Sequence, residues 1–279
     1  MNLRRLRMGL TTVLGLSSHG FFIPYRYARA VGAAERRTFD AITETFSSLH
    51  NDFSVVIDLV DSYRAELIAI PGTGEPPSPR WLQDWFPGLD AAVLYALIRH
   101  HRPRRILEIG SGHSTRFGAR AIADGDLSTT ITAIDPAPRT AINGLSARIL
   151  REPIQNVDPS EFGGIKAGDV VIIDSSHVLM PGSDVDVILN DILPRLEPGT
   201  LVHIHDVFLP DPYPEEWGWR GYNEQVAIAP LICRDGSYQT VFASCYARRA
   251  LSDRLARSVV KELPRLDGAI ESSLWLRKL

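Results

Sequence analysis

Two short stretches of the sequence place acids and histidines where a reaction could occur. GDVVIIDSSH carries Asp174 and His177 at its end, and LVHIHD ends at His205 and Asp206. Each stretch begins with an apolar run typical of a buried strand, so the polar residues follow strand ends. Histidine exchanges a proton near neutral pH, so His177 is the candidate general base for an acceptor hydroxyl. The alternative is a histidine that only caps a loop.

The acids at these two strand ends are expected to lie close enough to repel each other. Asp206 should lie beside Asp174, and two carboxylates in one cleft repel each other unless a proton or a cation lies between them. A divalent cation with oxygen ligands is the natural solution, and magnesium tolerates retained waters. In the alternative, Asp206 caps a turn and no metal binds.

A glycine turn lies earlier in the chain, in ILEIGSGHSTRFGAR (106–120). Gly110 and Gly112 allow a sharp turn that lies close to a ligand, and the helix expected next offers free N–H groups to an anion. Thr115 stands where a dinucleotide site has its third glycine, which favours a ligand without a pyrophosphate. Asp135, at the end of the next apolar run, can accept hydrogen bonds from both hydroxyls of a ribose.

EIGSGHST followed by AIDP resembles the S-adenosylmethionine site of class I methyltransferases. The resemblance implies that a cluster around the glycine turn surrounds the methionine end of the cofactor and that Asp135 holds the ribose. The cofactor-binding residues expected on this basis are Glu108, Gly110, Ser111, Gly112, Ser114, Asp135 and Asp174. A Rossmann-like domain for another nucleotide is the alternative, and a nicotinamide oxidoreductase is disfavoured by Thr115 and by the lack of a Tyr-x-x-x-Lys pair.

DSSH together with HIHD resembles metal-dependent sugar O-methyltransferases of macrolide biosynthesis, over about Trp81 to the C-terminus. The resemblance implies a metal held by Asp174, His205 and Asp206, with His177 as the base. It also implies a small-molecule acceptor such as a sugar, a glycoside or a phenol. Magnesium is the expected ion, but a histidine in place of an oxygen donor admits a softer ion such as manganese or iron. The rival hypothesis is a structural or regulatory module that binds the cofactor without catalysis.

The order of the elements predicts an α/β fold. The apolar runs RILEIG, TITAID, DVVIID and TLVHIHD alternate with stretches that suit helices, which is typical of a parallel sheet with helices on both faces. YQTVFASCYA and SSLWLRKL are expected as final strands. By resemblance, we expect a Rossmann-like methyltransferase fold with a mostly parallel seven-stranded sheet, an antiparallel last strand and an N-terminal helical extension. The expected domains are 1–80 (arm, helix and Pro-rich linker) and 81–279 (cofactor-binding domain).

A heptad pattern runs through residues 38–69 and predicts one long helix, because no proline or glycine interrupts it. The apolar positions are Phe39, Ile42, Phe46, Leu49, Phe53, Val56, Val60, Tyr63 and Leu67. The seam either pairs two subunits into a homo-oligomer, such as a dimer, or lies across the chain's own catalytic domain. Both interpretations stay open at this point.

The long loop from Phe208 to Gln225 contains Trp217 and Trp219. These rings could form a flat wall for a ring-shaped substrate, or they could simply pack on the surface.

Composition excludes some classes of partner. The net charge of −3 argues against nucleic acid. Cys233 and Cys245 lack a CxxC spacing, which favours a reducing, cytoplasmic location. The basic head MNLRRLRMGLTTVLGL is interpreted as a flexible or docking arm rather than a signal peptide, and contact of this arm and FFIPYR with a membrane is a less favoured interpretation.

Overall fold

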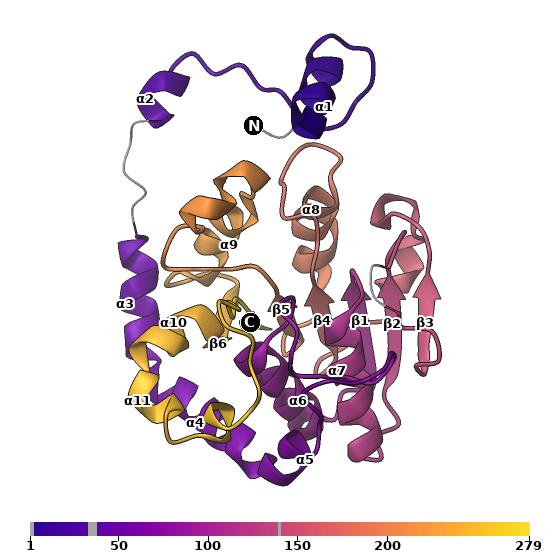
Figure 1. The fold of residues 1–279 in the computed structure, drawn as a ribbon, viewed down its shortest axis with the longest axis vertical. Helices are drawn as coiled ribbons and strands as arrows, with labels where there is room; N and C mark the ends of the chain where they lie inside the picture. Colours follow the sequence, from indigo (N-terminus) through magenta and orange to yellow (C-terminus); the bar gives the residue numbers. More distant parts are fainter. Residues whose placement is uncertain (1–2, 33–37, 139–140) are drawn as a thin grey trace. The chain divides into compact units, whose positions relative to one another are not determined.

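The structure is a computed structural model that describes residues 3–32, 38–138 and 141–279. The chain divides into two units, residues 1–37 and residues 38–279. In the first unit, α1 (Leu3–Val13) and α2 (Ala28–Gly32) are joined by a segment without regular secondary structure. The second unit contains the sheet, and therefore all the candidate site residues (Figure 1).

A seven-stranded sheet organises the second unit. Its strands are β1 (Arg105–Ile109), β2 (Thr130–Ile134), β3 (Ala147–Leu150), β4 (Val170–Ile173), β5 (Leu201–Ile204), β6 (Tyr238–Ala243) and β7 (Leu274–Lys278). They lie in the order β3-β2-β1-β4-β5-β7-β6. The first five pair in parallel, and β7 runs antiparallel to both β5 and β6. The expected mostly parallel sheet with an antiparallel last strand is confirmed.

The central strands form because their sequences are apolar on both faces. Every residue of β4 and β5 is buried, as parallel strands covered on both sides require. β4 begins and ends where the apolar run predicted. One expectation about the strands was wrong: YQTVFASCYA forms a strand only as far as Ala243, because α10 begins at Ser244. The short, half-exposed β3 is the strand of the seven for which the sequence indicated no residue range.

The remaining helices surround the sheet. They are α3 (Asp40–Ser48), α4 (His50–Ser62), α5 (Arg64–Ile68), α6 (Gly88–His101), α7 (His113–Asp124), α8 (Asp184–Val187), α9 (Glu224–Ile232), α10 (Ser244–Ala250) and α11 (Ser252–Leu255). All of α6 from Gly88 to Ile98 is buried, which suits a helix that is apolar on nearly every side. It packs against α7 and α4.

The heptad seam does not form the single long helix that was expected. Turns at Leu49 and Tyr63 divide residues 40–68 into α3, α4 and α5. Most of the seam is nevertheless buried: the Phe46 ring packs edge-on against Tyr246 at 5.3 Å, and Phe53 packs against Phe242 at 5.4 Å. The apolar pattern therefore lies across the chain's own domain, which was one of its two interpretations.

Pairing of subunits through these helices stays a prediction. It would have to use their outer face, where Val55 and Ile68 are exposed, because the seam itself is covered. The domain boundary at residue 80 also stays a prediction, since α3 to α5 share one compact unit with the sheet. None of the helices in the described part of the chain has the length and hydrophobicity to cross a bilayer.

Candidate functional site

The candidate site lies where β1, β4 and β5 end side by side. The strand register continues one residue beyond each strand: Asp174 N–H donates to the Ile109 carbonyl at 2.8 Å, and His205 N–H donates to the Ile173 carbonyl at 2.9 Å. The carboxyl edge of the sheet therefore gathers Gly110, Asp174 and His205, although they are up to 95 positions apart in the sequence. Ligands of open parallel sheets bind at this edge.

Gly110 provides the close approach between β1 and β4. Its φ is +87°, and a Cβ atom at this position would lie 2.3 Å from the Asp174 carbonyl oxygen. Glycine is required here because both the backbone conformation and the space exclude a side chain. Two residues later the Gly112 N–H donates to Thr115 Oγ1 at 2.9 Å. Thr115, which breaks the dinucleotide fingerprint, thus caps the start of α7.

Glu108 is a fully buried carboxylate beneath this turn. Ser114 Oγ donates to Glu108 Oε1 at 2.5 Å, while Oε2 is buried without a hydrogen-bond partner. Desolvation raises the pKa of Glu108 to about 7, because the hydrogen bonds from Ser114 and Thr115 offset only part of it. An unpartnered buried acceptor is costly, so this oxygen suits a cationic or donor ligand group.

Asp135 follows β2 and is partly exposed. Its Oδ2 accepts from Ser111 Oγ at 2.7 Å, and its Oδ1 accepts from the Ala137 N–H at 2.8 Å. These bonds fix the carboxylate, yet each oxygen keeps a further lone pair. The residues around the glycine turn therefore fit a cofactor with a cationic end and a ribose diol.

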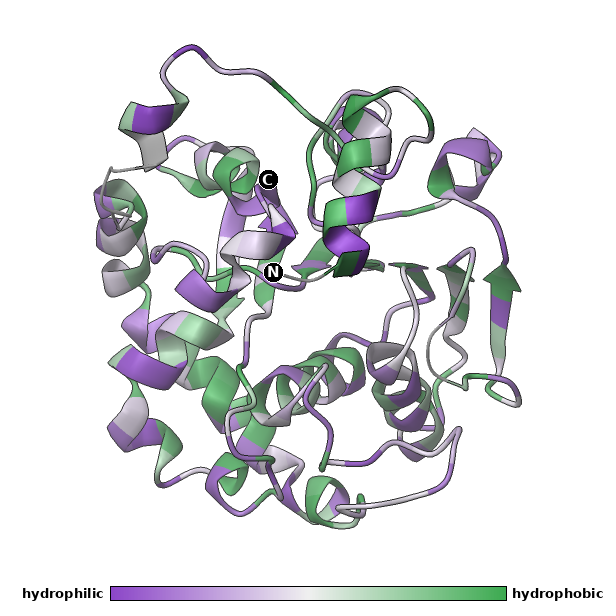
Figure 2. Cartoon of the chain, turned by 45° about the horizontal axis from the view of Figure 1, so that its top comes forward, coloured by the Kyte–Doolittle hydropathy of each residue, from purple (hydrophilic) through white to green (hydrophobic). Residues whose placement is uncertain are grey.

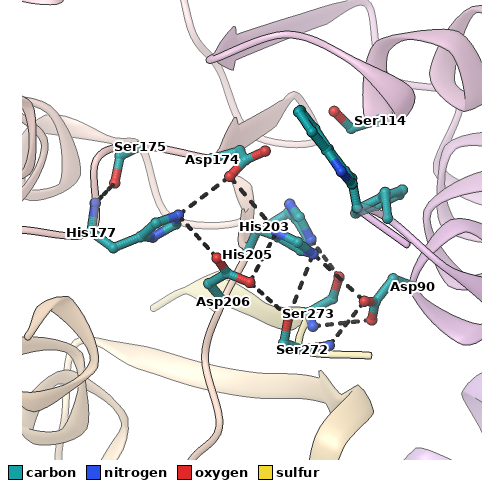
Figure 3. A network of polar contacts seen from close by, with 12 residues as sticks. Asp90, Ser114, Asp174, Ser175, His177, His203, His205, Asp206, Ser272 and Ser273 are labelled. Carbon is teal, nitrogen blue, oxygen red and sulfur yellow. Dashed lines mark hydrogen bonds and ion pairs between the residues drawn. The ribbon is translucent and has the colours of Figure 1, made fainter. Parts of the chain in front are cut away.

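His177 lies between the two strand-end acids (Figure 3). Its Nε2 is 3.3 Å from Asp174 Oδ1 and 3.5 Å from Asp206 Oδ2. Its Nδ1 donates to Glu224 Oε2 at 2.8 Å. The ring is 3 % exposed, whereas 46 % of the Asp174 side chain is exposed at the mouth of the site. The histidine is thus held from one side by Glu224, and its Nε2 faces the carboxylates of Asp174 and Asp206.

The backbone at His177 is in the left-handed region, with φ of +59°. The first residues of α9 hold this conformation, because the N–H groups of Asn223 and Glu224 donate to the His177 carbonyl at 3.0 and 3.3 Å. Asp206 is also left-handed, with φ of +54°. Strain of this kind in residues other than glycine is concentrated at functional sites.

His205 forms the second bridge between the acids. Its Nδ1 lies 3.7 Å from Asp174 Oδ1 and 3.5 Å from Asp206 Oδ1. On the other side, Nε2 lies 3.7 Å from Asp90 Oδ2, a carboxylate that is fully buried in α6. Asp90 also accepts from the backbone N–H groups of Ser272 and Ser273. The histidine therefore ties the ends of β4 and β5 to α6 and to the start of β7.

These contacts shift the pKa values of His177, His205 and Asp174. Desolvation lowers the pKa of His177 and His205, but the carboxylates around them outweigh it and raise both pKa values well above 6.5. Desolvation raises the pKa of Asp174, but the hydrogen bonds and charges of His177 and His205 together outweigh it and hold the pKa below its ordinary value. The surrounding carboxylates therefore favour the imidazolium form of both histidines.

These histidines occupy the space between the acids where a metal was expected. Within residues 3–32, 38–138 and 141–279, no group of three or more His, Cys, Asp or Glu side chains could hold a metal ion. The expected set of Asp174, His205 and Asp206 does meet, but its oxygens face histidine nitrogens and, at Asp206 Oδ1, the Ser272 hydroxyl at 3.1 Å. This arrangement of donors does not fit a metal centre.

The loop after β5 brings aromatic rings to the same cleft. Tyr222 lies 4.7 Å from His177 between ring centroids, and Trp217 packs against Tyr222 and Phe208. Of the two tryptophans of this loop, Trp217 belongs to the cluster, while Trp219 is 62 % exposed.

Three residues of the site were missed by sequence reasoning. Asp90 carried a signal, because it is the only charged residue in the apolar helical stretch GLDAAVLYALI. The sequence around Glu224 and Ser272 contains no motif that would have pointed to either residue. Both reach the site only when the chain folds.

The sheet topology and the glycine turn indicate the class of protein. A parallel sheet with an antiparallel β7, a glycine turn after β1 and an acid after β2 form a class I methyltransferase fold. Residues 107–207 match the family described as a methyltransferase domain, a segment that runs from β1 to just beyond β5. The match covers the strands that carry the glycine turn, Asp135, Asp174 and His205, and it supports the resemblance of this segment to S-adenosylmethionine-dependent methyltransferases.

Several solved structures resemble the chain at low sequence identity. The O-methyltransferase TomG from Streptomyces achromogenes, in complex with S-adenosylmethionine, is 16 % identical over 80 % of this chain and 89 % of that one, with a TM-score of 0.41. An O-methyltransferase from Bacillus cereus is 15 % identical over the same shares, also at 0.41. MycE, with magnesium, S-adenosylhomocysteine and mycinamycin VI, is 19 % identical over 78 % of this chain and 53 % of that one, at 0.36. No curated protein matches the sequence.

The close contact at Gly110 predicts a specific effect of adding one methyl group. Gly110→Ala should weaken S-adenosylmethionine binding at least tenfold, because the new Cβ must displace the Asp174 carbonyl. Gly168→Ala is the matched control, since Gly168 has a φ of +84° but open space around its Cβ position. Calorimetric titration of both variants measures the difference. Equal affinities would contradict the role of this contact.

Proposed function

We propose that this protein transfers a methyl group from S-adenosylmethionine to an oxygen atom of a small molecule. The observation that carries the proposal is the histidine held by Glu224 at the carboxyl edge of the sheet, with Nε2 facing Asp206 and the half-exposed Asp174. When bound, the cofactor supplies an electrophilic methyl group on a sulfonium. The chain's own residues must then position the acceptor oxygen and take its proton. A module that only binds the cofactor has no use for such a base.

The cofactor is proposed to lie over the turn after β1. Gly110, Ser111 and Gly112 would bring the backbone close to its methionine end, where Glu108 Oε2 faces no other partner. Ser114 holds Glu108 in place by donating to its other carboxylate oxygen, Oε1. Asp135 would accept from the ribose hydroxyls, while Asp174 borders the cleft between the cofactor and the base.

His177 is the proposed general base. In its neutral form, with Nδ1–H donating to Glu224, the Nε2 lone pair would accept the proton of the acceptor hydroxyl. The imidazolium so formed is stabilised by the carboxylates of Glu224, Asp174 and Asp206. Glu224 is a positioning residue in this scheme, because it sets the tautomer and the orientation of the ring.

A metal is not needed to neutralise the acids in this proposal. The two carboxylates of Asp174 and Asp206 are bridged by His177 and His205, which supply the positive charge that a cation was expected to supply. A metal held by Asp174, His205 and Asp206 would have to replace the contacts of His177 with both acids.

The acceptor is proposed to carry a ring next to its hydroxyl. Tyr222 borders the base and Trp217 packs against Tyr222, and the two rings would offer the amphipathic surface that a sugar, glycoside or phenol contacts. The free Cys233 and Cys245 support a reducing, cytoplasmic location.

The proposal is tested by methyl transfer itself. The purified protein is incubated with methyl-labelled S-adenosylmethionine and a panel of glycosides, phenols and lipids, with and without exhaustive chelation. We expect label on an oxygen of at least one ring-bearing acceptor, at the same rate after chelation. Binding of the cofactor without transfer to any acceptor would favour the non-catalytic module, and loss of activity on chelation would restore the metal hypothesis.

Glu108 predicts how cofactor affinity depends on pH. Its pKa is about 7, and only the ionised carboxylate attracts the cationic end of the cofactor. Affinity should therefore fall by roughly tenfold between about pH 8 and about pH 6, as the carboxylate takes up a proton. Calorimetry at several pH values checks this, with Glu108→Gln as the control. A slope that persists in this variant would show that another group is responsible.

His177 predicts both a rate and a pH profile. His177→Ala should lower turnover at least tenfold without weakening cofactor binding. In the wild type, kcat/KM should rise with pH through a midpoint above 6.5, because the base works only when deprotonated and its pKa is raised. Glu224→Gln removes one of the carboxylates that raise this pKa, so the midpoint should move down. An unchanged midpoint would show that Glu224 does not raise the pKa of His177.

A further inference from the structure

The N-terminal arm carries charge of one sign. Residues 1–34 contain five arginines and neither aspartate nor glutamate. Because the whole chain has a net charge of −3, residues 35–279 carry −8. A cationic segment joined to an anionic remainder is a typical sign of binding to a polyanionic partner or surface.

The helix α1 is amphipathic. Leu3, Leu6, Leu10 and Val13 recur at intervals of three and four, so they form one stripe along the helix, whereas Arg4, Arg5 and Arg7 fall outside it. Figure 2 shows hydrophobic and hydrophilic residues along this helix. No residue of α1 is buried, and Leu3, Leu10 and Val13 are 81, 53 and 58 % exposed.

A second apolar stretch follows α1 and is also exposed. Its large side chains are Phe21, Phe22, Ile23, Tyr25 and Tyr27, each more than half exposed. The guanidinium of Arg26 lies over the Tyr27 ring at 5.5 Å. Aromatic rings next to arginines are enriched where a protein meets the boundary between lipid and water. Exposed apolar groups of this density mark an interaction surface.

We propose that residues 3–27 dock on the surface of an anionic lipid bilayer, with α1 lying in the plane of the interface. The arginines match the charge of anionic headgroups, and the leucine stripe and the aromatic stretch match the acyl boundary beneath them. Nucleic acid would match the arginines but not the apolar side chains. The arm would hold the enzyme at a membrane surface, and this inference does not depend on the proposed chemistry.

The test measures co-sedimentation of the full-length protein with phosphatidylcholine vesicles that contain or lack phosphatidylglycerol. We expect binding only to the anionic vesicles, weakened by salt. The variant Arg4→Gln/Arg5→Gln/Arg7→Gln should bind roughly 100-fold more weakly, since each arginine near such a surface contributes about fivefold. The control Arg195→Gln/Arg234→Gln/Arg257→Gln makes the same charge change at exposed positions of the second unit and should bind like the wild type.

A second variant separates insertion from simple charge attraction. Leu6→Ser/Leu10→Ser keeps all the arginines and should also bind at least tenfold more weakly. The proposal is overturned if the wild type does not bind anionic vesicles or if the leucine variant binds as tightly as the wild type. It is also overturned if a random polynucleotide displaces the protein from the vesicles, or if mass spectrometry shows that the vesicle-bound protein lacks residues 3–27. Methyl transfer to a soluble acceptor should be unchanged in all these variants, which separates this test from that of the proposed function.

Discussion

The geometry of the cleft depends on two imidazole rings that lie between carboxylates. Without them, Asp174 and Asp206 would repel each other at the ends of adjacent strands. His177 and His205 each contact both acids, so the charges that would separate β4 and β5 instead join them. A buried charge is costly unless it is paired. Here Asp90, Asp206 and Glu224 are anchored by further hydrogen bonds. The same contacts that stabilise the cleft also set the protonation of its candidate base.

The cofactor edge and the base are close because the sheet is parallel. β1 supplies the glycine turn, β2 the acid after it, and β4 and β5 the acids and histidines, and all four strands end at one edge. The tight contact between Gly110 and the Asp174 carbonyl joins the two halves of the site directly. A binding pocket and a reaction centre can therefore share one rigid support.

The sequence allowed the strand ends to be located because parallel buried strands are continuous apolar runs with a polar residue after them. DVVIID is the clearest case, since β4 ends at Ile173 as its pattern indicates. The heptad seam shows the limit of such patterns: it predicted which face is buried, but not that turns at Leu49 and Tyr63 divide the helix or what covers it. Glu224 could not be predicted, because its contact with His177 spans 47 residues and arises only when the chain folds.

The strained loop of His177 has a mechanical consequence. Its carbonyl is bonded to the first residues of α9, and α9 is the continuation of the aromatic loop that contains Trp217 and Tyr222. An acceptor that pushes this loop aside therefore also pulls on the segment that carries the imidazole. The aromatic loop and the candidate base are therefore linked through backbone hydrogen bonds. A shift of the loop on acceptor binding would change the position of the His177 imidazole.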